Sequence, residues 1–146
     1  MALSAQTGSE RARQLTALTI RLGDRLDRES ETLEAHRPQD LYDGIEETRN
    51  LSNLYRHECA RIKMDPDLLK GMSPPEKLAL KTATQIFNDR LARYERALGA
   101  AKTVTEGVIA AVAEELNATR SQTATYGARG KTASTGPQSL NFNRTA

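Results

Sequence analysis

One segment constrains the fold more than any other. Residues 75–122 contain no proline after Pro75, and their apolar residues recur at alternating spacings of four and three. This heptad pattern predicts a single helix, about 70 Å long at 1.5 Å per residue. A helix of this length needs an antiparallel partner, which the two segments before it can supply. Its apolar positions are Leu80, Phe87, Leu91, Tyr94, Leu98, Ala101, Val108 and Val112, interrupted by Thr84 and Thr105.

Two shorter helices are predicted before it. The first covers residues 9–37, where Ser9 is the expected cap and Pro38 disfavours helical geometry at the preceding residue. The second covers residues 40–63 and is expected to begin at Asp40 as its cap. A connection rich in glycine and proline follows, with room for one short helical turn. The apolar stripe of the first helix consists of Leu15, Leu18, Leu22, Leu26 and Leu33, and that of the second of Leu41, Ile45, Leu51, Leu54 or Tyr55, Cys59 and Ile62.

The predicted fold class is all-α: a long antiparallel helical hairpin or three-helix coiled coil with a flexible C-terminal tail. Hydrophobic residues make up 38% of the 146 residues and aromatic residues 4%, which suits narrow helix-to-helix seams rather than a thick core. Residues 1–122 are expected to form the helical domain. Residues 123–146 are dominated by small polar residues and glycine, so we expect a disordered, partner-binding tail.

Charge and hydropathy exclude several functional classes. The formal net charge is +2, and no dense basic run indicates a nucleic-acid partner. The longest apolar run, residues 108–113, is far shorter than a membrane span. No signal peptide precedes the first helix, so the expected location is the cytoplasm. The single cysteine, Cys59, excludes a disulfide within the chain.

Catalytic chemistry is not indicated. His36 and His57 do not form the i, i+4 pair of a helical metal site, and we interpret both as solvated. The acidic pairs Glu46-Glu47 and Glu114-Glu115 are typical of solvated helix faces, whereas general acid–base catalysis needs carboxylates converging on a pocket. We therefore expect no enzyme activity, no cofactor and no metal.

Two features indicate protein binding instead. The end of the long helix carries a broad apolar surface that the shorter helices cannot fully cover, and such a face suits docking into a groove. The tail holds isolated apolar residues in a polar stretch, which is typical of segments that fold on binding. The predicted contacts are Val108, Ile109, Val112 and Leu116 on the helix, and Tyr126, Leu140 and Phe142 in or next to the tail.

These residues also suggest a family. The chain resembles the FlgN-type flagellar export chaperones in length and helix layout. The most specific parts are residues 51–58 (Leu-Ser-Asn-Leu-Tyr-Arg-His-Glu), the long helix with Phe87, Leu91 and Leu98, and the following Tyr-Gly-x-x-Gly element. That element here consists of Tyr126, Gly127, Ala128, Arg129 and Gly130, with Arg129 where an acidic residue is common in the family.

The resemblance implies a function. Such chaperones bind hook–filament junction (hook-associated) proteins and deliver them to the type III export gate. It also implies that the end of the long helix and the tail contact the client, with Tyr126, Gly127, Arg129 and Gly130 as binding residues. The alternative is a homodimeric coiled-coil scaffold or regulatory adaptor, which a continuous heptad suits equally well. A monomer is favoured over a homodimer. Measuring the mass in solution distinguishes the chaperone from the homodimeric scaffold.

Overall fold

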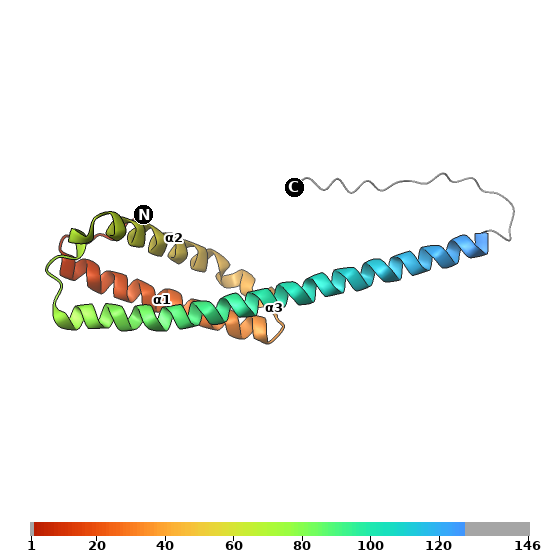
Figure 1. Ribbon diagram of the computed structural model, residues 1–146, viewed down its shortest axis with the longest axis horizontal. Helices are drawn as coiled ribbons and strands as arrows, with labels where there is room; N and C mark the ends of the chain where they lie inside the picture. The colour runs from red at the N-terminus through yellow and green to blue at the C-terminus, as the bar shows by residue number, and fades with distance from the viewer. Residues whose placement is uncertain (1, 128–146) are drawn as a thin grey trace. The chain divides into compact units, whose positions relative to one another are not determined.

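The computed structural model of the protein describes residues 2–127, with side chains through residue 124. These residues form three helices, α1 (Gly8–Glu34), α2 (Tyr42–Met64) and α3 (Pro74–Gly127). Two short 3₁₀ helices connect them, η1 (Pro38–Leu41) and η2 (Pro66–Leu69). No strand occurs between residues 2 and 127, so the predicted all-α class is confirmed (Figure 1).

Tertiary contacts divide the chain into two units, residues 1–104 and residues 105–146. The first unit contains α1, α2 and the first part of α3. The second contains the remainder of α3 up to Gly127. Helix α3 therefore continues five residues beyond its predicted end at residue 122. The remaining tail, residues 128–146, lies outside the described residues, and the predicted boundary at residue 123 stays a prediction.

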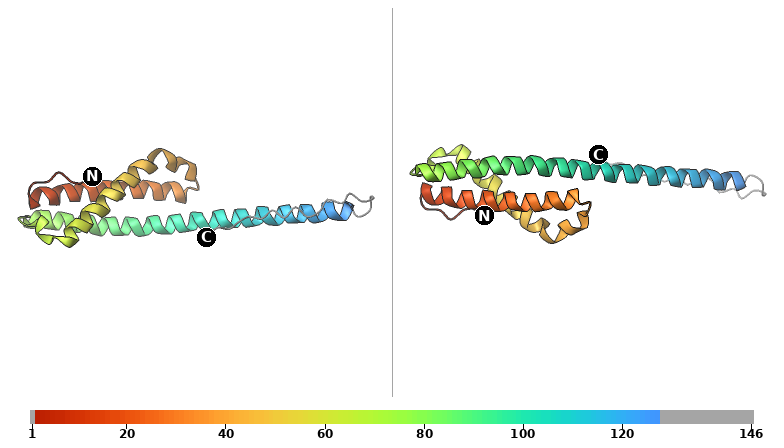
Figure 2. Two further views of the ribbon diagram at one scale, coloured as in Figure 1. Left: turned by 90° about the horizontal axis from the view of Figure 1, so that it is seen from above. Right: turned by 90° about the horizontal axis from the view of Figure 1, so that it is seen from below.

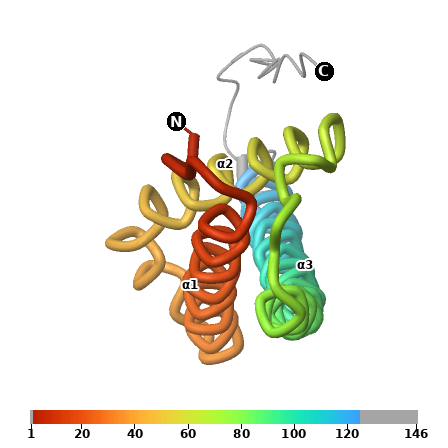
Figure 3. The backbone as a smooth tube through the Cα atoms, turned by 90° about the vertical axis from the view of Figure 1, so that its left-hand side faces the viewer, coloured from red at the N-terminus to blue at the C-terminus, as the bar shows by residue number. Residues whose placement is uncertain are grey.

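Within the first unit α1 and α3 run parallel, and α2 runs antiparallel to both. Contacts between α1 and α3 keep a nearly constant offset, from Ser9 with Glu76 to Asp27 with Arg93. In the contacts between α1 and α2, residue numbers rise along α1 while they fall along α2, from Arg11 with Glu58 to Arg21 with Glu47. Figure 3 shows the three helices from their ends, and Figure 2 shows α2 crossing the other two at an angle.

The core is a seam along α1. Five of its leucines are at most 7% exposed, because they recur on the side that faces both neighbouring helices. Phe87 of α3 and Leu51 of α2 are buried against this seam, and the Phe87 ring lies 4.9 Å from that of Tyr55. The buried leucines are Leu15, Leu18, Leu22, Leu26 and Leu33.

The buried face of α3 is rotated slightly from the predicted one. Ala97 is 8% exposed, whereas Leu98, which the heptad pattern assigned to the stripe, is 46% exposed. Leu80, Leu91 and Tyr94 are partly buried against the core. Alanine at this seam lets α3 approach α1 closely. Ala97 therefore takes the buried position that the heptad pattern assigned to Leu98.

Two predicted caps are wrong, and the cap of α3 is better defined than expected. Thr7 rather than Ser9 caps α1, with its hydroxyl accepting from the Glu10 backbone N–H at 3.1 Å. Asp40 lies within η1, and α2 has no side-chain cap because it continues directly from that turn. Ser73 and Glu76 form a reciprocal capping box at the start of α3.

Candidate partner-binding surfaces

The part of α3 from Val104 onward carries an uncovered apolar surface. Val104, Val108, Val112 and Leu116 are spaced by four residues, and Ile109 lies beside them on the same side of α3. Between 53% and 64% of each side chain is exposed. We call these five residues the apolar stripe. Every residue from 105 to 124 is exposed, so no described side chain of this stretch is buried in a core.

The structure places four predicted contact residues, Val108, Ile109, Val112 and Leu116, together on this stripe. Tyr126 and Gly127 lie in the last turn of α3 rather than in a separate tail. The other predicted contacts, Arg129, Gly130, Leu140 and Phe142, lie outside the described residues. The role of all these residues in partner binding stays a prediction.

A second surface, in the first unit, was missed by sequence reasoning. Because α2 crosses α1 and α3 at an angle, the three helices leave a groove of about 540 Å³ between them, which we call the apolar groove. This volume is in the range of pockets that hold small ligands or several side chains. Its lining comprises Leu22, Leu26 and Glu29 of α1, Ile45, Thr48, Arg49, Ser52, Asn53, Tyr55 and Arg56 of α2, and Phe87, Leu91 and Tyr94 of α3.

The floor of the groove is apolar and its α2 edge is cationic. Ile45 is 49% exposed although it lies beside Leu22 and Leu26, so the apolar surface stays open to solvent. Arg49 and Arg56 are seven residues apart on α2, and both are exposed. Arg49 pairs with Glu46 at 2.9 Å, whereas Arg56 makes no ion pair with the described residues. The signal for this groove in the sequence was the loose apolar stripe of α2. Ile45 and Tyr55 lie too far apart around the helix to face one narrow seam.

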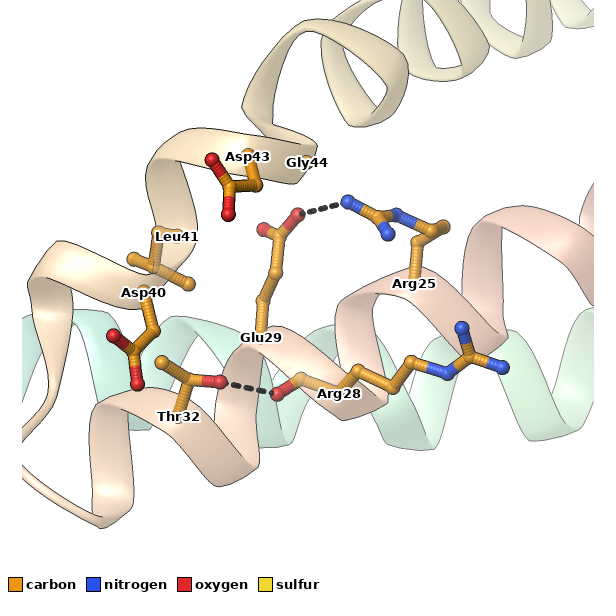
Figure 4. Close-up of a pocket in the computed structure, with 8 residues that line it drawn as sticks. All are labelled: Arg25, Arg28, Glu29, Thr32, Asp40, Leu41, Asp43 and Gly44. Atoms are coloured by element: carbon orange, nitrogen blue, oxygen red, sulfur yellow. Dashed lines mark hydrogen bonds and ion pairs between the residues drawn. The ribbon is translucent and has the colours of Figure 1, made fainter.

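A buried polar network closes one end of the groove. Glu29 accepts a hydrogen bond from the Thr48 hydroxyl and lies 3.7 Å from the Arg25 guanidinium. Burial raises the pKa of Tyr94, and the nearby carboxylate of Glu29 raises it further. Figure 4 shows Glu29 and Arg25 reaching from α1 towards the start of α2, where Gly44 lies. The Arg25 guanidinium lies directly over Gly44, where a Cβ atom would displace the end of this flexible side chain.

The two histidines and the cysteine lie on α2 and just after α1, and His57 and Cys59 line one open surface pocket on α2. The imidazole of His57 is half exposed, and His36, also exposed, has a positive φ of 56° just after α1. Cys59 is half buried, and burial together with this thiol raises the pKa of Tyr55 to about 12. Among the described residues no cluster of three potential metal ligands occurs, and none of the helices there is long and apolar enough to cross a membrane.

Comparison with known proteins identifies the family. The flagellar basal-body protein FlbY of Caulobacter vibrioides is 40% identical to the chain over 131 residues. The alignment covers 89% of this chain and 88% of that protein, so it includes all three helices. The chain belongs to the FlbY family. No family model and no solved structure matches it.

FlbY membership confirms the flagellar part of the resemblance drawn from the sequence. The FlgN-type assignment in particular stays a prediction, because the name of the relative does not specify an export chaperone. For the FlbY family the structure supplies two surfaces that have no partner among the described residues, the apolar stripe and the apolar groove.

Proposed function

We propose that this FlbY-family protein is a cytoplasmic chaperone of flagellar assembly. In this proposal it binds hook–filament junction (hook-associated) proteins and delivers them to the type III export gate, without enzymatic activity of its own. The observation that carries the proposal is the apolar stripe: five large aliphatic residues, each more than half exposed, on a stretch of α3 that has no buried side chain.

The stripe has the chemistry that a chaperone for helical clients needs. A client segment that later packs as an amphipathic helix must have its apolar side covered until assembly. A helix that presents apolar residues at i, i+4 and i+8 covers such a side by helix-to-helix packing. Burial of a few aliphatic side chains gives moderate affinity, because association offsets much of that gain. Moderate affinity permits release at the export gate.

FlbY membership supports the flagellar context of the proposal. The first unit is held together by its leucine seam and by ion pairs between α1 and α3, such as Arg93 with Asp27 at 2.7 Å and Arg93 with Glu34 at 2.6 Å. We further propose that Tyr126 and residues 128–146 contact the client or the gate.

Co-purification from motile cells tests the proposal. The tagged full chain should capture one or more hook-associated proteins and a component of the export gate, identified by mass spectrometry. A matched chain with Val108→Asp and Val112→Asp should lose the client while keeping its thermal stability, since neither side chain is buried. Capture of no flagellar protein by the unaltered chain would contradict the proposal.

A further inference from the structure

The apolar stripe and the apolar groove have matching dimensions. The groove wall on α2 extends over twelve residues, from Ile45 to Arg56, or about 16 Å of helix. The stripe extends over thirteen residues, from Val104 to Leu116, or about 18 Å. A helix with the length of the stripe therefore fits along the groove wall.

Their charges also match. Arg49 and Arg56 line the groove edge, and Arg56 has no acidic partner within the described residues. Glu115 follows Val112 by three residues and Val108 by seven, so its carboxylate borders the stripe on the same side of α3. Glu114 adds a second exposed carboxylate to this stretch. The acidic apolar stripe and the cationic apolar groove attract one another, whereas like charges disfavour the pairing of two stripes or of two grooves.

We propose that the apolar stripe of one copy of this protein docks in the apolar groove of a second copy. In the paired form the aliphatic side chains of the stripe cover Ile45, Leu91 and Tyr94 of the partner copy, and the Glu115 carboxylate at the stripe edge faces its Arg56. Each copy carries one stripe and one groove, so a dimer holds at least one such contact. The C-terminal segment is a poorer occupant, because residues 123–146 contain three basic residues and no acid.

This pairing goes beyond the chaperone proposal and does not rest on it. It differs from the monomer that the sequence favours, because the groove could not be foreseen from the sequence. Where both proposals hold, a client that covers the stripe displaces the second copy, and the client-bound form contains one chain.

Sedimentation equilibrium of the full chain without client tests the pairing. We expect a monomer–dimer equilibrium in a concentration series extending to hundreds of micromolar. Arg56→Glu in the groove and Glu115→Arg beside the stripe should each raise the dimer dissociation constant at least about tenfold. The chain with both changes should regain much of the lost affinity, because the charges are exchanged. Leu78→Asp, at an exposed position of α3 outside both surfaces, should leave dimerisation unchanged.

Three outcomes would overturn the pairing. The first is a chain that stays monomeric throughout the concentration series. The second is a dimer that persists with Ile45→Asp and Arg56→Glu together, which would indicate that two stripes pair with each other. The third is a double charge exchange that restores nothing. Circular dichroism of each variant checks its folding, and client capture, measured separately, still decides the chaperone proposal.

Discussion

At the scale of single residues, the carboxylate of Glu58 joins three parts of the first unit. It is fully buried on α2, accepts hydrogen bonds from the Leu3 backbone N–H and the Arg11 guanidinium at 2.9 Å, and pairs with Arg61 at 3.1 Å. Burial alone would raise the pKa of Glu58, but Leu3, Arg61 and Arg11 outweigh it and hold the pKa below its usual value. The N-terminal segment, α1 and α2 therefore depend on one ionised group.

Replacing Glu58 should destabilise the first unit strongly. Glu58→Gln keeps the shape but leaves the buried Arg11 without its charge partner, which should cost about 3 kcal/mol of unfolding free energy. Denaturant unfolding measures this loss. Glu46→Gln is the matched control, because its pair with Arg49 is exposed and should contribute less than about 1 kcal/mol. Equal effects of the two changes would contradict this role of Glu58.

The same carboxylate predicts a pH dependence. A Glu whose pKa is lower in the folded chain stabilises the fold above its unfolded pKa, about 4.3, and this stabilisation is lost as the pH falls through the lower folded value. The stability difference between the natural chain and Glu58→Gln should therefore be constant near neutral pH and shrink below about pH 4. Unfolding curves at several pH values measure it. A difference that grows on acidification would contradict the assignment.

Core burial makes a second residue-scale prediction. Leu22 is 2% exposed, so Leu22→Ala should reduce the free energy of unfolding by about 2–5 kcal/mol. Leu91 is only partly buried and lines the groove, so Leu91→Ala should cost less than about 2 kcal/mol. Thermal or denaturant unfolding of both variants measures the contrast. A larger loss of unfolding free energy for Leu91→Ala than for Leu22→Ala would contradict a core centred on the α1 leucines.

At the scale of elements, α3 consists of one stretch that packs against other helices and one stretch that does not. Residues 80–97 have side chains buried against α1 and α2, whereas residues 105–124 have no buried side chain. Short helices without tertiary packing are marginal in water. Gly107 lowers helix propensity further, and a Cβ there would touch nothing within 4 Å.

Gly107→Ala should therefore stabilise the second stretch locally by up to about 1 kcal/mol. Amide hydrogen exchange should slow around residues 105–116 and stay unchanged around residues 83–97. Gly23→Ala is the control in the first unit, where a Cβ would make ordinary contact with the Arg90 side chain at 3.4 Å, and it should leave exchange around residues 105–116 unchanged. Exchange in residues 105–116 that is as slow as in residues 83–97 of the natural chain would show that this stretch is already held by other contacts.

The helices were predictable from the sequence because heptad spacing and Pro38 act locally. The positions of α1, α2 and α3 agree with prediction to within a few residues. The angle at which α2 crosses was not predictable, since it depends on how side chains of different helices pack together, such as Arg25 and Glu29 of α1 with Thr48 of α2. The groove results from that angle and was therefore missed. The stripe was foreseen, because counting residues already showed that α1 and α2 are too short to cover it.

At the scale of the whole molecule, the buried core and the proposed client-binding stripe lie in different stretches of the chain. All buried apolar side chains among the described residues precede residue 98, and the stripe begins at Val104. Removing residues 128–146 should therefore leave the melting temperature of the first unit nearly unchanged. If these residues contact the client or gate as proposed, the same truncation should weaken capture from motile cells. A truncated chain that captures its partners at full strength would contradict that contact.

The central claim is that the apolar stripe holds a flagellar client. The most direct measurement is calorimetric titration of the purified full chain with a purified hook-associated protein. We predict one-to-one binding that weakens at least about tenfold with Val108→Asp, because an unpaired carboxylate is buried at the interface, while Leu78→Asp binds as the natural chain does. Undiminished binding by the Val108→Asp chain, or no binding by the natural chain, would contradict the account.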